Sequence, residues 1–271
     1  MRALLKGIMA VTVTGAVALS AACSRPAPKP ASPPPSSLPA QSDYLSPPEP
    51  TAAARSPGGD LVLSGAARPD ALIRLASPDG SAIGVTAAHD GAWTLTVPSG
   101  GQPRMYSLSE DASGRLLRAP GYITALPRPA PAAVMVRPGA GAVPLERGAQ
   151  PLNIATVDFD SGGAVVASGL ATPRTTVRTR LDGADAGEDR ADDHGVYTVS
   201  LSSSVRPGPH MIEAVSGSSR AEAAFDVSPS HAIVKPPFAA TPGQSRWRID
   251  WMTPGGGVQT TLVFQSTEAA P

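Results

Sequence analysis

Ser64-Gly-Ala-Ala-Arg-Pro69 recurs 104 residues later as Ser168-Gly-Leu-Ala-Thr-Pro173. Each copy then reaches a glycine followed by an aromatic residue and a threonine, Gly91-Ala-Trp-Thr94 in the first and Gly195-Val-Tyr-Thr198 in the second. Residues 58–97 and 162–201 align without a gap and are identical at 12 of 40 positions. Chance does not keep glycines and prolines in register over this length, so the chain contains two copies of one module.

Both copies contain short strand-like segments separated by turns. Alternate residues are apolar after the Gly91 and Gly195 turns, which is the pattern of a strand with one buried face. Strands at this spacing, with no helical segments between them, predict an all-β protein in which each copy is a small β-sandwich. The predicted strands are residues 60–64, 72–75, 93–97, 105–108 and 121–125, and residues 164–168, 176–179, 196–201, 211–215 and 221–227.

The composition excludes two classes of protein. Lys plus Arg and Asp plus Glu both number 22, and without a basic run the chain is not expected to bind nucleic acid. The 31 prolines and the lack of 3.6-residue periodicity exclude a helical bundle.

The N-terminus has the layout of a secretory signal. Arg2 and Lys6 precede an uncharged stretch, residues 7–22, that ends in small residues. A transmembrane helix needs about 20 strongly apolar residues, whereas this stretch is shorter and contains serine, threonine and glycine. We therefore expect residues 1–22 to be a signal peptide.

Cys23, the only cysteine, follows directly, and Leu19-Ser-Ala-Ala-Cys23 resembles the lipobox of bacterial lipoproteins, with Ser20 where leucine is commonest. The resemblance implies a palmitate-type acylation of Cys23, cleavage before it and attachment to a lipid bilayer. Ordinary signal-peptidase cleavage after Ala22 is the alternative. In lipoproteins of Gram-negative bacteria an aspartate after the cysteine favours inner-membrane retention, so Ser24 implies the outer membrane. We expect the protein to face the periplasm, and surface exposure is the alternative.

Residues 24–57 contain 11 prolines in 34 positions and are expected to form a disordered, semi-rigid stalk. The predicted organisation is a signal peptide, the lipidated cysteine with its Pro-rich linker, a first sandwich, a second linker, a second sandwich, and a C-terminal β-hairpin with a tail. Their residues are 1–22, 23–57, 58–126, 127–150, 151–228 and 229–271. Within the second linker, residues 133–137 resemble a strand and could belong to the second sandwich.

The pattern Ser-Gly-x-Ala-x-Pro, followed by a strand and x-Gly-x-aromatic-Thr, resembles the bacterial immunoglobulin-like modules of cell-envelope proteins. The resemblance covers about residues 55–126 and 151–228. It extends to modules that precede a peptidoglycan-binding LysM domain in some alphaproteobacterial proteins. This sequence contains no LysM pattern, so their wall-binding function does not carry over.

Catalytic and metal-binding motifs do not occur, so we expect a non-enzymatic protein without a cofactor or metal. Three segments contain acidic or histidine side chains of the kind that bind metal ions, but each has a plainer interpretation. The first pair reads as turns before glycine, the second segment as an Asx-capped hairpin turn, and the third as a solvated acidic loop. They are His89-Asp90-Gly91 with its equivalent Asp192-Asp193-His194-Gly195, then Asp158-Phe-Asp160-Ser-Gly162, and finally Asp182, Asp185, Glu188 and Asp189.

Residues 246–251 and 258–264 flank a Thr-Pro-Gly-Gly-Gly turn and are expected to form a hairpin that packs on the second sandwich or forms its edge. Trp247, Ile249 and Trp251 would share one face, with Arg248 and Asp250 on the other. This stripe is the candidate partner contact, while burial in a core is the alternative. The sequence thus predicts an envelope lipoprotein that serves as a structural or protein-interaction adaptor, or that binds carbohydrate or peptidoglycan through the aromatic hairpin.

Overall fold

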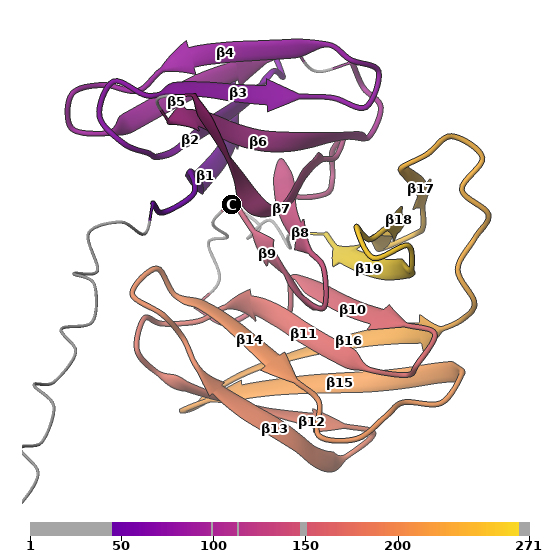
Figure 1. Cartoon of the computed structure of the whole chain (residues 1–271). Helices are drawn as coiled ribbons and strands as arrows, with labels where there is room; N and C mark the ends of the chain where they lie inside the picture. Colours follow the sequence, from indigo (N-terminus) through magenta and orange to yellow (C-terminus); the bar gives the residue numbers. More distant parts are fainter. Residues whose placement is uncertain (1–44, 99, 113, 147–150, 266–271) are drawn as a thin grey trace, which may run out of the picture. The chain divides into compact units, whose positions relative to one another are not determined.

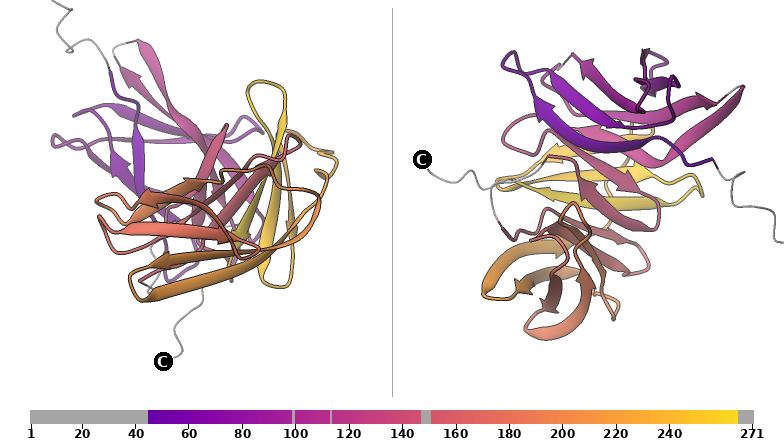
Figure 2. Two further views of the ribbon diagram at one scale, coloured as in Figure 1. Left: turned by 90° about the horizontal axis from the view of Figure 1, so that it is seen from below. Right: turned by 90° about the vertical axis from the view of Figure 1, so that its left-hand side faces the viewer.

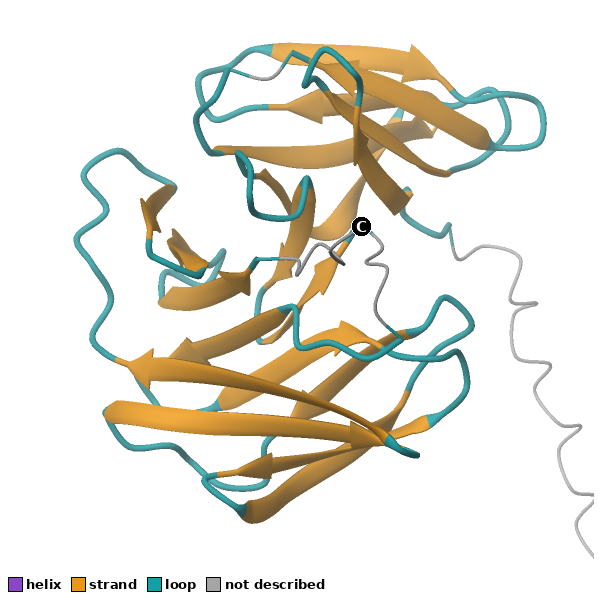
Figure 3. Cartoon of the chain, turned by 180° about the vertical axis from the view of Figure 1, so that it is seen from behind, coloured by secondary structure: helices purple, strands orange, loops and turns teal. Residues whose placement is uncertain are grey.

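The computed structural model describes residues 45–98, 100–112, 114–146 and 151–265, within a compact unit spanning Tyr44–Pro271. The predicted signal peptide, Cys23 and the stalk up to residue 44 lie outside these ranges. Every regular element described is a strand, as Figure 3 shows, which confirms the all-β prediction. The described part of the chain has no helix long and apolar enough to cross a membrane.

The first module is a sandwich of a three-stranded sheet and four strands of a six-stranded sheet (Figure 1). Ile73 and Leu75 alternate with exposed residues, as do Trp93, Leu95 and Val97, and these apolar side chains fill the core between the sheets. One sheet has the order β1 (Glu49–Arg55), β2 (Leu61–Ala66), β5 (Ala92–Val97); the other has the order β4 (Ala82–Thr86), β3 (Leu72–Ala76), β6 (Arg104–Ala112), β7 (Arg115–Ala125).

The second module repeats this topology strand for strand. The starts of β2, β3, β5, β6 and β7 recur at a constant offset of 104, so the repeat extends beyond the 40 residues visible in the sequence. This shared arrangement of seven antiparallel strands is the immunoglobulin-like fold. One sheet has the order β14 (Val196–Ser200), β11 (Val165–Leu170), β10 (Thr156–Asp160); the other has the order β13 (Ala184–Arg190), β12 (Thr176–Leu181), β15 (Gly208–Ser216), β16 (Ser219–Val227).

The glycine and the aromatic residue of the repeated motif form one packing unit. A Cβ on Gly169 would lie 2.1 Å from the Asn153 carbonyl oxygen and 2.9 Å from the Tyr197 hydroxyl, which donates a hydrogen bond to that carbonyl. In the first module a Cβ on Gly65 would meet the Trp93 ring at 2.4 Å. Only glycine permits this approach, which explains why the motif keeps Ser-Gly opposite an aromatic residue.

Replacing Gly169 by alanine is expected to lower the free energy of unfolding by about 1–3 kcal/mol, because the new methyl group overpacks a closed site. Urea denaturation of the full chain measures this. Gly255→Ala is the control, since no atom lies within 4 Å of a Cβ placed there. Equal effects of the two substitutions would show that the close approach at Gly169 is not a constraint.

Both modules carry additional strands that correct the predicted boundaries. Residues 127–150, predicted to be a linker, contain the hairpin of β8 (Ala133–Arg137) and β9 (Ala140–Pro144), and β8 pairs with β7. The strand at 133–137 therefore extends the sheet of the first module, not that of the second. The predicted stalk is also too long, because β1 begins at Glu49 and pairs with β2.

The C-terminal hairpin extends a sheet of the second module, as expected, but a third strand pairs with the hairpin and forms the edge. Val258–Phe264 (β19) pairs with β10, Arg246–Met252 (β18) pairs with β19, and Phe238–Pro242 (β17) pairs with β18. The sheet therefore runs β14-β11-β10-β19-β18-β17.

A third hydrophobic core joins the two modules through these additional strands. Figure 2 shows β18 and β19, in yellow, between the first module and the rest of the second. Trp251 is fully buried and meets Tyr122 of β7 edge-on at 6.1 Å between ring centroids. The first-module side contributes Met105, Leu126, Ala130, Val134, Val136 and Ala142, and the hairpin contributes Ile249, Trp251 and Val263.

Candidate functional site

The predicted contact stripe is divided between the third core and its margin. Ile249 and Trp251 are both 0% exposed, and the Trp251 indole donates a hydrogen bond to Thr261 Oγ1 at 3.1 Å. Only Trp247 is partly exposed, at the margin of the same core. Two of the three side chains are therefore unavailable to a partner, which agrees with the alternative that the stripe is part of a core. Because Trp251 is buried, the stripe does not offer an aromatic platform on which a saccharide could stack.

Arg248 and Asp250 lie on the opposite face of β18, as the alternation predicted. The Arg248 guanidinium bonds the Asp250 carboxylate at 2.9 Å and donates to the Pro229 carbonyl at 2.8 Å, so it holds the segment that leaves β16. Asp250 also accepts a hydrogen bond from Thr260 at 2.5 Å and lies 3.5 Å from His231 Nδ1. These contacts satisfy a buried carboxylate and make this cluster structural.

Asp158 is a buried ionisable group whose pKa is raised. Its carboxylate lies inside β10, fully buried, and accepts hydrogen bonds from the Ala142 amide at 2.8 Å, the Thr261 hydroxyl at 2.5 Å and the Gln259 amide at 3.4 Å. Burial raises its pKa to about 6, while these hydrogen bonds and Arg137 act in the opposite direction. The hairpin interpretation of Asp158–Gly162 therefore holds for Asp160, which caps Gly162 N at 2.8 Å, but not for Asp158.

Side chains of β10 and β19 take the place of a neighbouring strand for β9. The Thr156 hydroxyl donates to the Ala142 carbonyl at 3.0 Å, and the Gln259 amide donates to the Ala140 carbonyl at 3.2 Å. Gln259 Oε1 accepts from the Gly139 amide at 3.1 Å. Together with Asp158, these polar contacts bind the first module's hairpin to the second module alongside the third core.

The acidic segment of the second module is a strand rather than the predicted loop. Asp185, Glu188 and Asp189 lie on β13, where Arg180 bonds Asp185 at 3.2 Å and Arg178 bonds Glu188 at 3.1 Å. Pairing with β12 and these cross-strand ion pairs offset the low β-propensity of the acidic residues. Asp182 precedes the strand and accepts a hydrogen bond from the Met211 amide at 2.9 Å.

The equivalent histidine-containing turns are held by backbone capping. Asp90 accepts a hydrogen bond from the Ala92 amide at 2.9 Å, and Asp192 accepts one from the Val196 amide at 2.8 Å. His89 lies 3.3 Å from Asp70 at an exposed position. Across the described ranges, no three His, Cys, Asp or Glu side chains are placed to hold a metal ion.

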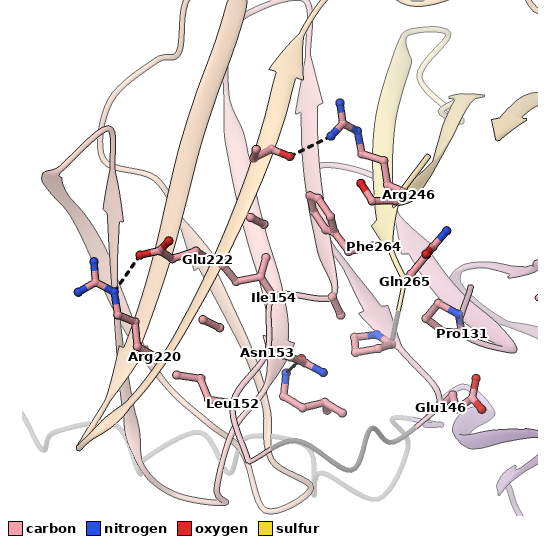
Figure 4. Close-up of a pocket in the computed structure, with 17 residues that line it drawn as sticks. Pro131, Glu146, Leu152, Asn153, Ile154, Arg220, Glu222, Arg246, Phe264 and Gln265 are labelled. Atoms are coloured by element: carbon pink, nitrogen blue, oxygen red, sulfur yellow. Dashed lines mark hydrogen bonds and ion pairs between the residues drawn. The ribbon is translucent and has the colours of Figure 1, made fainter. Parts of the chain in front are cut away.

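A groove of about 630 Å³ runs beside β16, and no sequence pattern indicated it (Figure 4). Ile154 and Phe264 form an apolar floor, and alanines of β16 form one wall. Arg246 stands at one end and donates a hydrogen bond from Nη1 to the Ala224 carbonyl at 2.9 Å. The other lining residues are Pro131, Pro144, Glu146, Leu152, Asn153, Ala155, Leu170, Arg220, Glu222, Ser245 and Gln265.

The backbone of β16 faces this groove with unused hydrogen-bonding groups. Met211, the cross-strand partner of Ala224, directs both backbone groups to Asp182 and so away from β16. This makes Met211 and Ala224 a non-hydrogen-bonded pair, in which both residues point their N–H and C=O groups outward. By alternation, Arg220, Glu222 and Ala224 direct their backbone outward, and among the described residues only the Ala224 carbonyl has a partner.

Comparison with known proteins adds little to the fold assignment made from strand order. No protein-family model and no curated protein matches the chain. The BSP domain of a biofilm associated protein is 14% identical over 69% of this chain, with a TM-score of 0.24, and this chain spans 30% of that structure. The central fibronectin-III array of RIM-binding protein is 12% identical over 84% of this chain and 98% of its own length, with a TM-score of 0.27. The immunoglobulin-like assignment therefore rests on strand order and register.

Proposed function

We propose that this chain is a lipid-anchored protein of the bacterial cell envelope whose two modules act as a structural and protein-binding adaptor, without catalytic activity. Support for the anchor comes from the sequence: a signal-like N-terminus ending in Leu19-Ser-Ala-Ala-Cys23, followed by a stretch rich in proline. Two acyl chains on one cysteine anchor a protein stably, and a proline-rich stretch holds the modules away from the bilayer.

The observation that carries the adaptor role is the junction of the two modules. A repeat joined by a free linker would present two independent surfaces. Here a third core around Trp251 and the polar contacts of Asp158 and Gln259 combine them into one compact unit. Such a unit presents surfaces of both modules in a fixed relation, which suits a spacer or a docking platform.

Replacing Cys23 by alanine tests the anchor. We expect the variant to lose palmitate labelling and to move from the membrane fraction to the soluble fraction, because the acyl chains supply the membrane affinity. Ser24→Asp is the sorting control: it should keep the label and shift the protein from the outer to the inner membrane. Unchanged labelling of Cys23→Ala would refute lipidation and leave ordinary signal-peptide cleavage as the explanation.

A further inference from the structure

The outer edge of β16 differs from other sheet edges of the molecule. An exposed strand edge is a template for pairing, and proteins protect such edges with proline, bulges or blocking side chains. The edge of β1 carries Pro50 and a register shift, and β17 ends in Pro242. On β14, the Asp189 carboxylate already bonds the Thr198 amide at 2.8 Å. By contrast β16 is nine residues long, contains no proline and pairs with β15 without a register shift, and the bond from Arg246 blocks a single outward group, the Ala224 carbonyl.

The internal repeat shows what such an edge accepts. In the first module, β7 is the equivalent strand, and β8 adds to its outer edge along residues 122–125 in antiparallel orientation. In the second module, the chain after β16 turns away to β17 in the other sheet. The groove exposes residues 220–224 of β16, which precede the stretch equivalent to the one that β8 covers. The edge of this strand therefore accepts an antiparallel strand in the first module, at residues equivalent to 226–229 and not to the residues 220–224 that line the groove.

The shape and charge of the groove define the occupant. Arg246, Phe264 and Gln265 line the groove together with residues of β16, so a strand that pairs with β16 would also contact them. Ile154 and Phe264 offer an apolar floor to alternate side chains of that strand. Two arginines and two glutamates line the groove, Arg220, Arg246, Glu222 and Glu146, so it favours no net charge.

From this geometry we propose that β16 binds an extended, uncharged apolar segment of a partner protein, which adds as a fifth strand to the β13-β12-β15-β16 sheet. The outward N–H and C=O groups of Arg220 and Glu222 and the N–H of Ala224 supply the hydrogen bonds, while the Ala224 carbonyl stays bonded to Arg246. The floor selects apolar side chains at alternate positions. This inference rests on the proposed protein-binding function and names its site and the class of partner.

The test uses the sequence of β8 as a probe. A fluorescein-labelled, amidated peptide Ala-Ala-Val-Met-Val, residues 132–136 of this chain, is titrated into the full chain in mild detergent and followed by fluorescence anisotropy. We expect saturable binding that weakens at least tenfold in Ala224→Pro, because proline removes the outward N–H without touching the ladder to β15. Ala224→Val, which adds bulk but keeps the N–H, should bind as the unaltered chain does.

Hydrogen exchange measured by NMR gives a second readout. The amides of Glu222 and Ala224 should become protected when the peptide binds, while those of Ala221 and Ala223 are already protected by β15. Absence of saturable binding, equal binding by Ala224→Pro, or a dimer of the chain that Ala224→Pro dissolves would each overturn the proposal. Cys23→Ala leaves this binding unchanged, so failure of the anchor and failure of the edge are distinguishable.

Discussion

Replacing Trp251 by alanine is expected to lower the free energy of unfolding by about 3–5 kcal/mol, the usual cost of removing a buried aromatic side chain. Trp251 is 0% exposed, packs edge-on against Tyr122 and donates a hydrogen bond to Thr261. Its removal leaves a cavity in the core between the modules and takes away the hydrogen bond that Thr261 Oγ1 accepts, while Thr261 still donates to Asp158. Urea denaturation of the full chain, followed by circular dichroism, measures the loss.

Trp247→Ala is the matched control, because Trp247 belongs to the same strand face but lies at the margin of the core. It should cost clearly less than Trp251→Ala. If Trp251→Ala stayed within about 0.5 kcal/mol of the unaltered chain, the usual range for a surface substitution, the side chain would be exposed in solution and the interface interpretation of the stripe would return.

The second large effect is a pH dependence of stability that Asp158 imposes. An aspartate in the unfolded chain ionises near its ordinary pKa of 3.8, whereas burial raises the pKa of Asp158 to about 6 in the folded protein. Between these values the folded state holds a proton that the unfolded state has released. The contribution of protonated Asp158 to the free energy of unfolding is therefore complete below about pH 4 and is lost as the pH rises to about 6. At roughly 1.4 kcal/mol per pKa unit this contribution amounts to about 3 kcal/mol.

Asp158→Asn isolates this contribution, because asparagine cannot ionise. Unfolding free energies of both proteins are measured by urea denaturation from pH 4 to pH 7, and their difference is plotted against pH. Other titrating groups contribute equally to both proteins and cancel in that difference. One of them is His210: desolvation lowers its pKa, but its hydrogen bonds to Asp182 and to the Arg206 carbonyl outweigh this and raise the pKa. A difference that is flat over this range would show that Asp158 titrates normally.

The sequence predicted those elements that carry local patterns. The repeated glycines, prolines and alternating apolar residues located most strands of both modules, and β8 and β19 have the predicted bounds. The strands that it missed are β1, β4, β9, β10, β13 and β17. Two of them show why: β1 has alanines and a proline of low β-propensity, and β13 has acidic residues that suggested a loop. Both are strands because a neighbour pairs with them.

The junction and the groove depend on contacts between distant residues. Tyr122 and Trp251 are 129 positions apart, and Asp158 meets Thr261 at a separation of 103. No sequence periodicity indicates such pairs, so the sequence alone could not decide whether the tryptophan stripe is buried in a core or forms an interface. The open edge of β16 depends on where the chain goes after it, which strand patterns alone do not show.

The most direct test of this account is the distance between the two modules. Spin labels at Ser81→Cys in the β3–β4 turn and Ser218→Cys in the β15–β16 turn, both exposed, report it by double electron–electron resonance, with Cys23 replaced by alanine. A packed third core predicts one narrow distance distribution that broadens in Trp251→Ala. A broad distribution in the parent protein, as expected if residues 127–150 were a flexible linker, would contradict it.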